Sequence, residues 1–348
     1  MKIFSPKEEL TKILKGESIG YFPRSIPVFG PIVDIMKLTD SYFPDGNYKE
    51  EPMSRLALGA HEYGNWNAIM MPWASTIEME ALGCKVTIKD DIAEYPLWKS
   101  CAFNDLDEVS FGKDIFKKGS FPAIFNAIKI VREKIVNKYS DKIPIVGMFQ
   151  GPFTILSYSL GFDKMFKYMI KETEKASKAL NIISELNIKY ASKMLNCGAD
   201  LLLMSDPVAE GLGRKEFEGI LVPIYKKINQ SLESESFIHI CGKTSRIIKS
   251  LPESGFKGYS FDYPKLSLDF VKETLGNKMK VIGSVPTVTH LLEGTKEEVV
   301  DISNYMMENG TDILAPSCGL PQYTPLENIK AMAEAIANYN KKNYGIEF

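Results

Sequence analysis

Cysteine and histidine are both scarce in this chain, which has 348 residues but only five cysteines and three histidines. An odd and low number of cysteines in a chain of this length argues against a disulfide framework and for a reducing compartment. In such a compartment thiols persist, and cysteine can serve as a metal ligand. We therefore predict a cytoplasmic protein in which a cysteine close to a histidine is a candidate for metal binding.

Two further absences narrow the range of partners. The formal net charge is only −2, because 42 lysines and arginines nearly balance 44 aspartates and glutamates, so there is no electrostatic basis for binding nucleic acid or an anionic membrane surface. No stretch approaches the roughly 18 consecutive apolar residues that a membrane span requires. Residues 1–9 turn polar and acidic too early for a signal peptide. We expect neither nucleic acid nor a membrane among the partners.

What the chain does contain is a repeated alternation of short apolar runs with longer stretches of helical periodicity. Hydrophobic residues make up 45% of the sequence, which is ample for a large core. Continuous apolar runs of four to eight residues are typical of parallel strands that are buried on both faces. Eight such runs occur, at residues 26–29, 68–71, 143–148, 201–204, 237–240, 258–261, 281–284 and 313–315.

The stretches between these runs are expected to be helices. Residues 166–196 have helical periodicity, which Gly198 ends. The last helix is expected to begin with Thr324 as its N-cap, followed by Pro325 in the first helical position and Glu327 three residues after the cap.

Strands that alternate with helices predict βαβ units and a parallel sheet. Eight of them favour a closed (β/α)8 TIM barrel over an open doubly wound sheet, in one domain over residues 1–348 with an N-terminal helical extension. The segment from about 73 to 140 is too long for one crossover. We therefore expect an insertion over the barrel mouth after the second strand.

One histidine and two cysteines stand at predicted strand ends. In His239-Ile240-Cys241 the two polar side chains lie two residues apart, so they point to the same face with their Cα atoms roughly 6.5–7 Å apart. Cys318 follows the last apolar run, and the active sites of barrels lie at the carboxyl ends of the strands. The three side chains are therefore predicted to meet as metal ligands. The alternative for a His-x-Cys pattern is simple packing, because cysteine is often buried.

These residues also carry a family resemblance. His239-Ile240-Cys241-Gly242, followed by residues 315–319 and 324–328, resembles the methylcobamide:coenzyme M methyltransferases of the uroporphyrinogen decarboxylase superfamily, whose members are TIM barrels. The similarity runs nearly end to end and includes residues 80–84, 150–154 and 206–209. In that subfamily the His-x-Cys and the later Cys bind zinc, which implies zinc at His239, Cys241 and Cys318.

The resemblance implies a zinc-dependent methyltransferase. Three protein ligands leave one position for substrate, and the metal charge lowers the pKa of a bound thiol. The thiolate of a small thiol such as coenzyme M would attack the methyl group of a methyl-Co(III) corrinoid, with Co(I) leaving. The corrinoid would be carried by a separate methylated corrinoid protein, because the chain shows no recognisable cobalamin-binding module.

Three alternatives to this function remain open. In the first, the methyl group travels in the opposite sense, from a methylated donor to a Co(I) corrinoid protein. In the second, the barrel is a binding protein without activity. Uroporphyrinogen decarboxylase is the third alternative, and it is disfavoured because residues 23–30 contain one arginine, Arg24, where those enzymes have an arginine-rich segment for the porphyrin carboxylates.

Other residues are candidates for catalysis or cofactor binding. Asp262, at the end of the run 258–261, is either a displaceable fourth zinc ligand or a residue that caps a helix or binds loop amides. Asp206 and Gln150 also stand at strand ends; Asp206 may instead be a turn residue before Pro207. Catalytic roles are predicted for Asp262, Asp206 and Gln150, and cofactor binding for Glu80, Met71 and Ser284, although Glu80 could also be a buried polar contact or part of a helix surface. Cys84, Cys101 and Cys197 are interpreted as structural.

Overall fold

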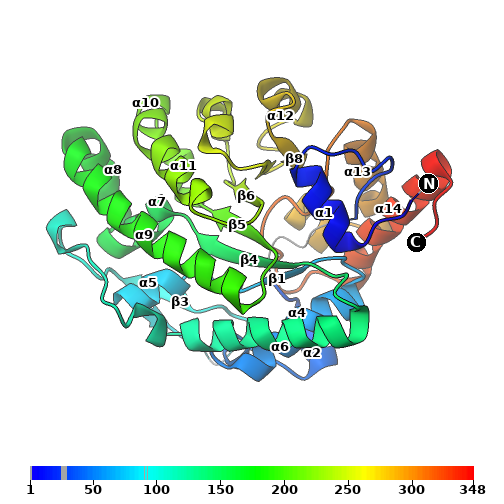
Figure 1. Cartoon of the computed structure of the whole chain (residues 1–348), viewed down its shortest axis with the longest axis horizontal. Coiled ribbons are helices and arrows are strands. Elements are labelled where there is room, and N and C mark those ends of the chain that lie inside the picture. Colours follow the sequence, from blue (N-terminus) through cyan, green and yellow to red (C-terminus); the bar gives the residue numbers. More distant parts are fainter. Residues whose placement is uncertain (1, 25–29, 90, 92) are drawn as a thin grey trace.

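The centre of the protein is a parallel sheet of six strands in the order β1-β4-β5-β6-β7-β8. The computed structural model describes residues 2–24, 30–89, 91 and 93–348. Every neighbouring pair in this sheet is parallel, as expected where helices connect successive strands (Figure 1). The strands are β1 (Ile69–Met71), β4 (Ile145–Gln150), β5 (Leu201–Ser205), β6 (Ser236–His239), β7 (Gly258–Ser260) and β8 (Lys280–Ile282).

Six of the eight predicted strands are these six elements. The predicted run at 313–315 continues the sheet beyond β8, through isolated parallel bridges between Ile282 and Ile313 and between Val285 and Pro316. It forms no regular strand, in part because Pro316 has no amide hydrogen to donate to a ladder. The predicted run at 26–29 lies outside the described residues. The alternation of strands and helices is that of the predicted (β/α)8 barrel.

Helices wrap the outside of the sheet, and the two ends of the chain lie side by side (Figure 1). The Phe22 amide donates to the Asn340 side chain at 2.9 Å, and the rings of Tyr21 and Phe348 are 5.7 Å apart. The helices are α1 (Pro6–Leu14), α2 (Val33–Thr39), α3 (Asp45–Tyr48), α4 (Glu50–Gly64), α5 (Ile77–Leu82), α6 (Phe121–Tyr139), α7 (Pro152–Leu160), α8 (Phe162–Lys171), α9 (Thr173–Cys197), α10 (Arg214–Glu216), α11 (Val222–Gln230), α12 (Leu268–Leu275), α13 (Lys296–Glu308) and α14 (Leu326–Tyr344).

The strands separate two hydrophobic cores, because alternate side chains of a strand point to opposite faces. The larger core lies between the sheet and the helices and takes Met71, Met204 and Ile238 from the strands. The smaller core fills the barrel, and α1 closes it at the amino end of the strands. Its members include Met70, Val146, Met148, Leu201, Leu203, Phe237 and Ile282 from the strands and Leu10, Ile13 and Leu14 from α1. The same alternation decides which polar side chains reach the barrel mouth.

The predicted insertion after the strand at 68–71 is present. It consists of α5, an antiparallel hairpin of β2 (Lys85–Thr87) and β3 (Leu97–Ser100), and two short 3-10 turns at Leu106–Glu108 and Ile115–Lys117. The crossover back to β4 is α6. Two hairpin side chains, Ile88 and Leu97, are about half exposed.

Two predicted helix boundaries are wrong. The single helix expected at 166–196 is divided into α8 and α9, because Glu172 has φ −133° and leaves the helical region, and the Thr173 hydroxyl bonds the Met169 carbonyl there. The last helix begins at Leu326 with Pro325 as its N-cap. Thr324 does not cap it: its hydroxyl donates to the Pro321 carbonyl. The Leu326 amide is instead bound by the Asp34 carboxylate, 292 residues away, at 3.2 Å.

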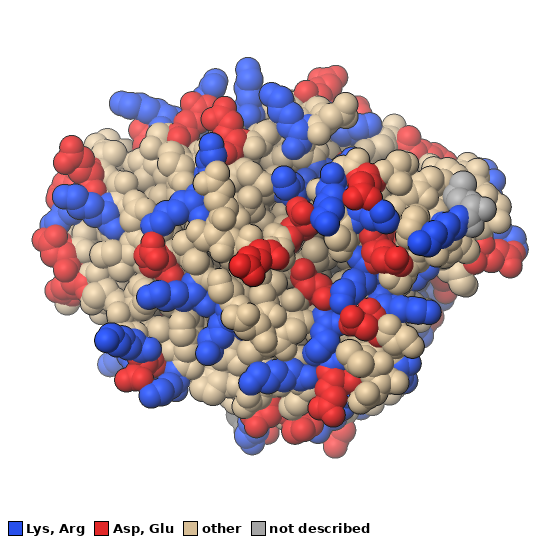
Figure 2. All heavy atoms as spheres, in the orientation of Figure 1, with Lys and Arg blue, Asp and Glu red and all other residues tan. Residues whose placement is uncertain are grey.

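The surface offers no dominant charge of one sign on the face in Figure 2, where lysine and arginine side chains are interspersed with aspartate and glutamate. Within the described residues, none of the helices has both the length and the apolar character that crossing a membrane demands.

The end of α9 provides a test of local backbone geometry. Gly198 has φ +118°, and a Cβ there would lie 3.0 Å from the Cβ and Cγ atoms of Arg132. Gly198→Ala should therefore lower the free energy of unfolding by about 2 kcal/mol. The control is Gly219→Ala, where no described atom lies within 4 Å of the new Cβ and the change should be neutral or slightly stabilising. Urea unfolding measures both; equal effects would contradict the geometry.

Candidate metal centre

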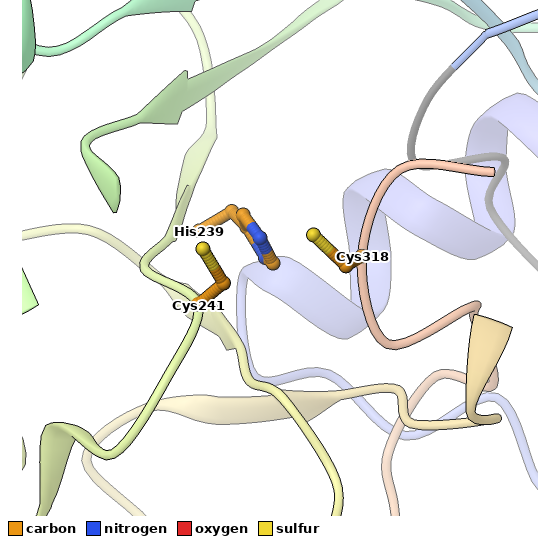
Figure 3. Close-up of side chains that lie close together, drawn as sticks. All are labelled: His239, Cys241 and Cys318. Carbon is orange, nitrogen blue, oxygen red and sulfur yellow. The ribbon is translucent and has the colours of Figure 1, made fainter. Parts of the chain in front are cut away.

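His239, Cys241 and Cys318 lie together at the carboxyl end of the strands. His239 is the last residue of β6, Cys241 follows two residues later, and Cys318 lies in the loop after the bridged segment 313–316. One ligand atom from each of the three lies within 4.8 Å of the others. Figure 3 shows His239 and Cys241 side by side on one segment, with the His239 ring between Cys241 and Cys318, which lies on another segment. The structure thus brings together the three residues that the sequence predicts as ligands, in a geometry that could hold a metal ion.

Ser260, which the sequence reasoning missed, orients the histidine. His239 pairs with Ser260 in the β6–β7 register, and its Nδ1 atom lies 3.0 Å from the Ser260 Oγ. Both side chains are buried. Because Nδ1 is occupied by Ser260, Nε2 is the ring nitrogen that would bind a metal. The partner could not be read from the sequence, since it depends on which residues of two strands pair.

Cys241 and Cys318 are joined by a hydrogen bond between their side chains. A hydrogen bond from Cys241 lowers the pKa of the Cys318 thiol, with further help from a hydrogen bond to His239 and from electrostatic interaction with its ring. The same hydrogen bond, with burial and the negative charges of Cys318 and Asp262, raises the pKa of Cys241. Cys318 is therefore the sulfur that is favoured as thiolate. An imidazole beside a thiolate and a thiol is a donor set for a borderline-soft divalent metal.

Asp262 lies next to this cluster but contacts a loop. Its Oδ2 atom accepts a hydrogen bond from the Gly242 amide at 3.2 Å. Burial, followed by the charge of Cys318, raises the pKa of the half-buried carboxyl group. Among the described residues, the group of ligand atoms within 4.8 Å of one another contains His239, Cys241 and Cys318 and not Asp262. Its contact is that of a residue binding loop amides, and its role as a fourth ligand stays a prediction.

Asp206 is buried on the outer face of the sheet and anchors α7. Its Oδ1 accepts from the Thr154 amide and hydroxyl at 2.7 and 2.6 Å, and its Oδ2 from the Phe153 amide and the Tyr225 hydroxyl at 3.2 and 2.7 Å. The approach is so close that a Cβ on Gly151 would lie 2.3 Å from the Asp206 Cγ. These contacts neutralise the positive end of α7. A catalytic role of Asp206 stays a prediction.

Gln150 shares the level of His239 at the barrel mouth. Gln150 pairs with Ser205, and Ser205 pairs with His239, so the three residues end neighbouring strands. Gln150 has the parity of Met148, which faces the barrel interior, and its Nε2 lies 3.6 Å from the Met148 Sδ. Its side-chain oxygen has no hydrogen-bond partner within the part of the chain that is described. The amide oxygen is thus free to contact a substrate, and a catalytic role of Gln150 stays a prediction.

The three residues predicted to bind a cofactor occupy separate positions. Met71 is fully buried in the core between the sheet and the helices. Ser284 joins two strand ends: its hydroxyl donates to the Phe261 carbonyl at 2.7 Å and accepts from the Tyr263 amide at 3.2 Å. Glu80 accepts from the Tyr48 hydroxyl at 3.0 Å in a part-buried contact. Their contacts are those of packing and anchoring residues, and cofactor binding at these positions stays a prediction.

Glu78 is a second residue that the sequence reasoning missed. It is 1% exposed, and its Oε1 atom accepts from the Gln150 amide at 2.8 Å. Because β1 pairs with β4 only as far as Gly147, the carboxylate supplies the acceptor that a longer β1 would have offered. Burial raises the pKa of Glu78 to about 7. Glu80, two residues later, also stands between two apolar residues in the sequence. The two carboxylates are therefore distinguished only by how deeply the fold buries them.

The sequence matches the family described as uroporphyrinogen decarboxylase (URO-D) over residues 5–339. It is 30% identical to "Methylcobamide:CoM methyltransferase MtaA" of Methanosarcina barkeri, over 97% of this chain and 99% of that protein. It is 28% identical to the corresponding MtbA of Methanosarcina acetivorans, with the same coverage. A solved structure described as a methyltransferase from Methanosarcina mazei matches with a TM-score of 0.92 and 30% identity, over 97% and 99% of the two chains. The predicted barrel and the predicted resemblance are confirmed.

The buried carboxyl group of Glu78 predicts how the stability of the protein depends on pH. The unfolded carboxyl group releases its proton near its ordinary pKa of 4.5, whereas the folded one holds it to about 7. Between these values the folded state binds the extra proton, so stability falls as pH rises. Glu78→Gln keeps an acceptor for Gln150 but cannot ionise. Between pH 4.5 and 8 the free energy of unfolding of the wild type should therefore fall by about 3 kcal/mol relative to that of Glu78→Gln.

Urea unfolding at several pH values measures this difference. The matched control is Glu174→Gln on the exposed face of α9, which should follow the wild-type pH dependence. A parallel pH dependence of Glu78→Gln and wild type would contradict the burial of an ionisable group at this position.

Proposed function

The chain belongs to the uroporphyrinogen decarboxylase (URO-D) family, and we propose that it is a zinc-dependent methyltransferase that moves a methyl group from a methylated corrinoid protein to a small thiol such as coenzyme M. The observation that carries the proposal is the cluster of one imidazole and two cysteine sulfurs within 4.8 Å at the barrel mouth. The names of the full-length relatives, which are methylcobamide:CoM methyltransferases, support the same reaction.

The donor set fits zinc. Zinc binds imidazole nitrogen at about 2.0–2.1 Å and thiolate sulfur at about 2.3 Å, usually with four ligands in a tetrahedron. His239, Cys241 and Cys318 would supply three of these, and Cys318 is already favoured as thiolate. A bound zinc ion would lower the pKa of a substrate thiol that takes the remaining position, so that the thiolate predominates near neutral pH.

The protein's own residues prepare the site for this transfer. Ser260 holds the His239 ring so that Nε2 points to the metal position. In this proposal Asp262, whose Oδ2 accepts from the Gly242 amide, would serve as a displaceable fourth ligand that makes way for the substrate sulfur. The sulfur then attacks the methyl carbon, the cobalt–carbon bond breaks, and its electron pair leaves with cobalt as Co(I). The products are a methyl thioether and the reduced corrinoid on the partner protein.

Decarboxylation of a porphyrin is the less favoured activity. A substrate with many carboxylates requires several guanidinium partners. The single arginine of the 23–30 segment, Arg24, forms an ion pair with Glu9 at 3.3 Å and lies over the Phe348 ring at 4.3 Å. Glu9 is in α1, which closes the amino end of the barrel, so Arg24 is engaged away from the mouth.

Metal analysis and a methyl-transfer assay test the proposal. The purified full chain should hold about one zinc ion and transfer methyl from methylcobalamin to coenzyme M. The Cys318→Ser variant should lose most of its zinc and its methyl-transfer activity. Cys197 is the last residue of α9 and lies outside the cluster, so Cys197→Ser should keep both. Full transfer by a zinc-free protein in the presence of a chelator would overturn the proposal. Methylation of Co(I) corrinoid by a methylated donor, without transfer to thiols, would assign the reverse direction.

Ser260 generates a second prediction at the same site. Ser260→Ala removes the hydrogen bond to Nδ1, which should weaken zinc binding by about 10- to 100-fold. Competition with a chromophoric chelator measures the affinity without any assay of activity. Ser303→Ala is the matched control, because Ser303 is also fully buried and its hydroxyl has no partner in the part of the chain that the structure describes. Equal zinc affinities of both variants would show that Ser260 does not position the ligand.

A further inference from the structure

Two cysteines outside the metal centre face each other at the base of the β2–β3 hairpin. Cys84 precedes β2 and Cys101 follows β3. On one side of them Lys85 pairs with Ser100 in the antiparallel register. On the other side the Cβ position of Gly83 lies 3.8 Å from the Cβ of Ala102. Because the register continues through both neighbouring pairs, Cys84 and Cys101 stand opposite each other.

This arrangement matches what a disulfide requires. Residues opposite each other in antiparallel strands have Cβ atoms about 4.5–5.5 Å apart and point to the same face, and a disulfide joins Cα atoms about 4.4–6.8 Å apart. Little backbone movement would therefore bring the two sulfurs together.

Both sulfurs also lie against the same structural element, the end of α7. The Cys84 Sγ lies 3.8 Å from the Tyr158 carbonyl and 3.7 Å from the Ser159 hydroxyl. The Cys101 Sγ lies 3.6 Å from the Cβ position of Gly161, which directly follows α7. The Ser159 carbonyl accepts the amides of Ala102 and Phe103 at 3.0 and 2.9 Å, which holds the strand end in place.

The two thiols differ in accessibility. Cys84 is buried, with 5% of its surface exposed, whereas Cys101 is partly exposed, and both are reduced. Burial raises the pKa of the Cys84 thiol. An accessible thiol beside a buried one is the arrangement of an attacking and a resolving cysteine.

We propose that Cys84 and Cys101 form a redox-active dithiol, which small-molecule disulfides oxidise to a cross-strand disulfide at the base of the hairpin. The Cys101 thiolate attacks one sulfur of the external disulfide, which forms a mixed disulfide and releases one small thiolate. Cys84 gives its proton to that thiolate and attacks the Cys101 sulfur. The second small thiolate then leaves and takes up the proton that Cys101 released. Two protein thiols are oxidised, and one external disulfide is reduced to two thiols.

The Cys84–Cys101 disulfide would form beside the last turn of α7, near the candidate metal centre. The Trp98 side chain of β3 donates to the Tyr158 carbonyl at 3.0 Å, so the hairpin is fastened to the last turn of α7. Tyr158 in turn lies within electrostatic range of Cys241. A disulfide at this position would lock the hairpin against the element that forms one side of the site. Its formation depends on neither zinc nor methyl transfer, so the test is independent of the proposed function.

The experiment treats the full, zinc-supplemented chain with oxidised glutathione and maps disulfides by mass spectrometry after tryptic digestion without reduction. Cleavage at lysine and arginine separates the two cysteines into peptides 56–85 and 100–113. The wild-type protein should yield these two peptides as one cross-linked species that dithiothreitol separates. Because Cys241 and Cys318 fall in other peptides, oxidation at the metal centre gives different products.

Variants identify the order of attack. Cys84→Ser should lose the cross-link and accumulate the glutathione mixed disulfide on Cys101. Cys101→Ser should lose the cross-link and leave Cys84 unmodified, because Cys84 is buried. Cys197→Ser is the matched control and should form the cross-link like the wild type. A mixed disulfide that persists on Cys101 in the wild type, a bond from Cys101 to another cysteine, or no oxidation of either thiol would overturn the proposal.

Discussion

Four neighbouring strands of the barrel end at one level, where Gln150 of β4 pairs with Ser205 of β5, Ser205 with His239 of β6, and His239 with Ser260 of β7. Everything else at the barrel mouth depends on this register. Because side chains alternate along a strand, a shift of one residue would turn His239 into the core between sheet and helices and would bring Ile240 to the mouth. The apolar residues below His239, such as Phe237 inside the barrel, fix the register through burial.

Where the strands end at the same level, their last backbone amide and carbonyl groups are buried and need hydrogen-bond partners from the protein. The protein supplies buried carboxylates for them. Glu78 takes the Gln150 amide where β1 is too short, and Asp206 takes two amides at the start of α7. Each carboxylate costs desolvation, which its hydrogen bonds partly offset. These groups hold the strand ends and α7 in place around the three candidate ligands, and they do so from the outer side of the sheet.

Four of the five cysteines form two pairs in contrasting environments. Cys241 and Cys318 come from different strand ends and share a hydrogen bond beside an imidazole, which suits a metal. Cys84 and Cys101 lie opposite each other in a hairpin against α7, without a histidine among their contacts in the described structure, which suits exchange with a disulfide. The chemistry of the thiol is the same in both pairs. The neighbours decide whether it serves as a ligand or as an electron donor.

Periodicity in the sequence was sufficient to predict the barrel, six of its strands and the insertion, because burial on both faces leaves a continuous apolar run such as Leu201–Met204. Spacing and family resemblance likewise predicted that His239, Cys241 and Cys318 would converge. Partners that are distant in the chain were beyond reach: the Ser260 hydroxyl at His239, the Asp34 carboxylate at α14, and the burial that separates Glu78 from Glu80. Sequence alone determines which side chains a strand turns inward. Only the tertiary structure decides which of these side chains meet, because that depends on strand register and on which charged groups are buried away from water.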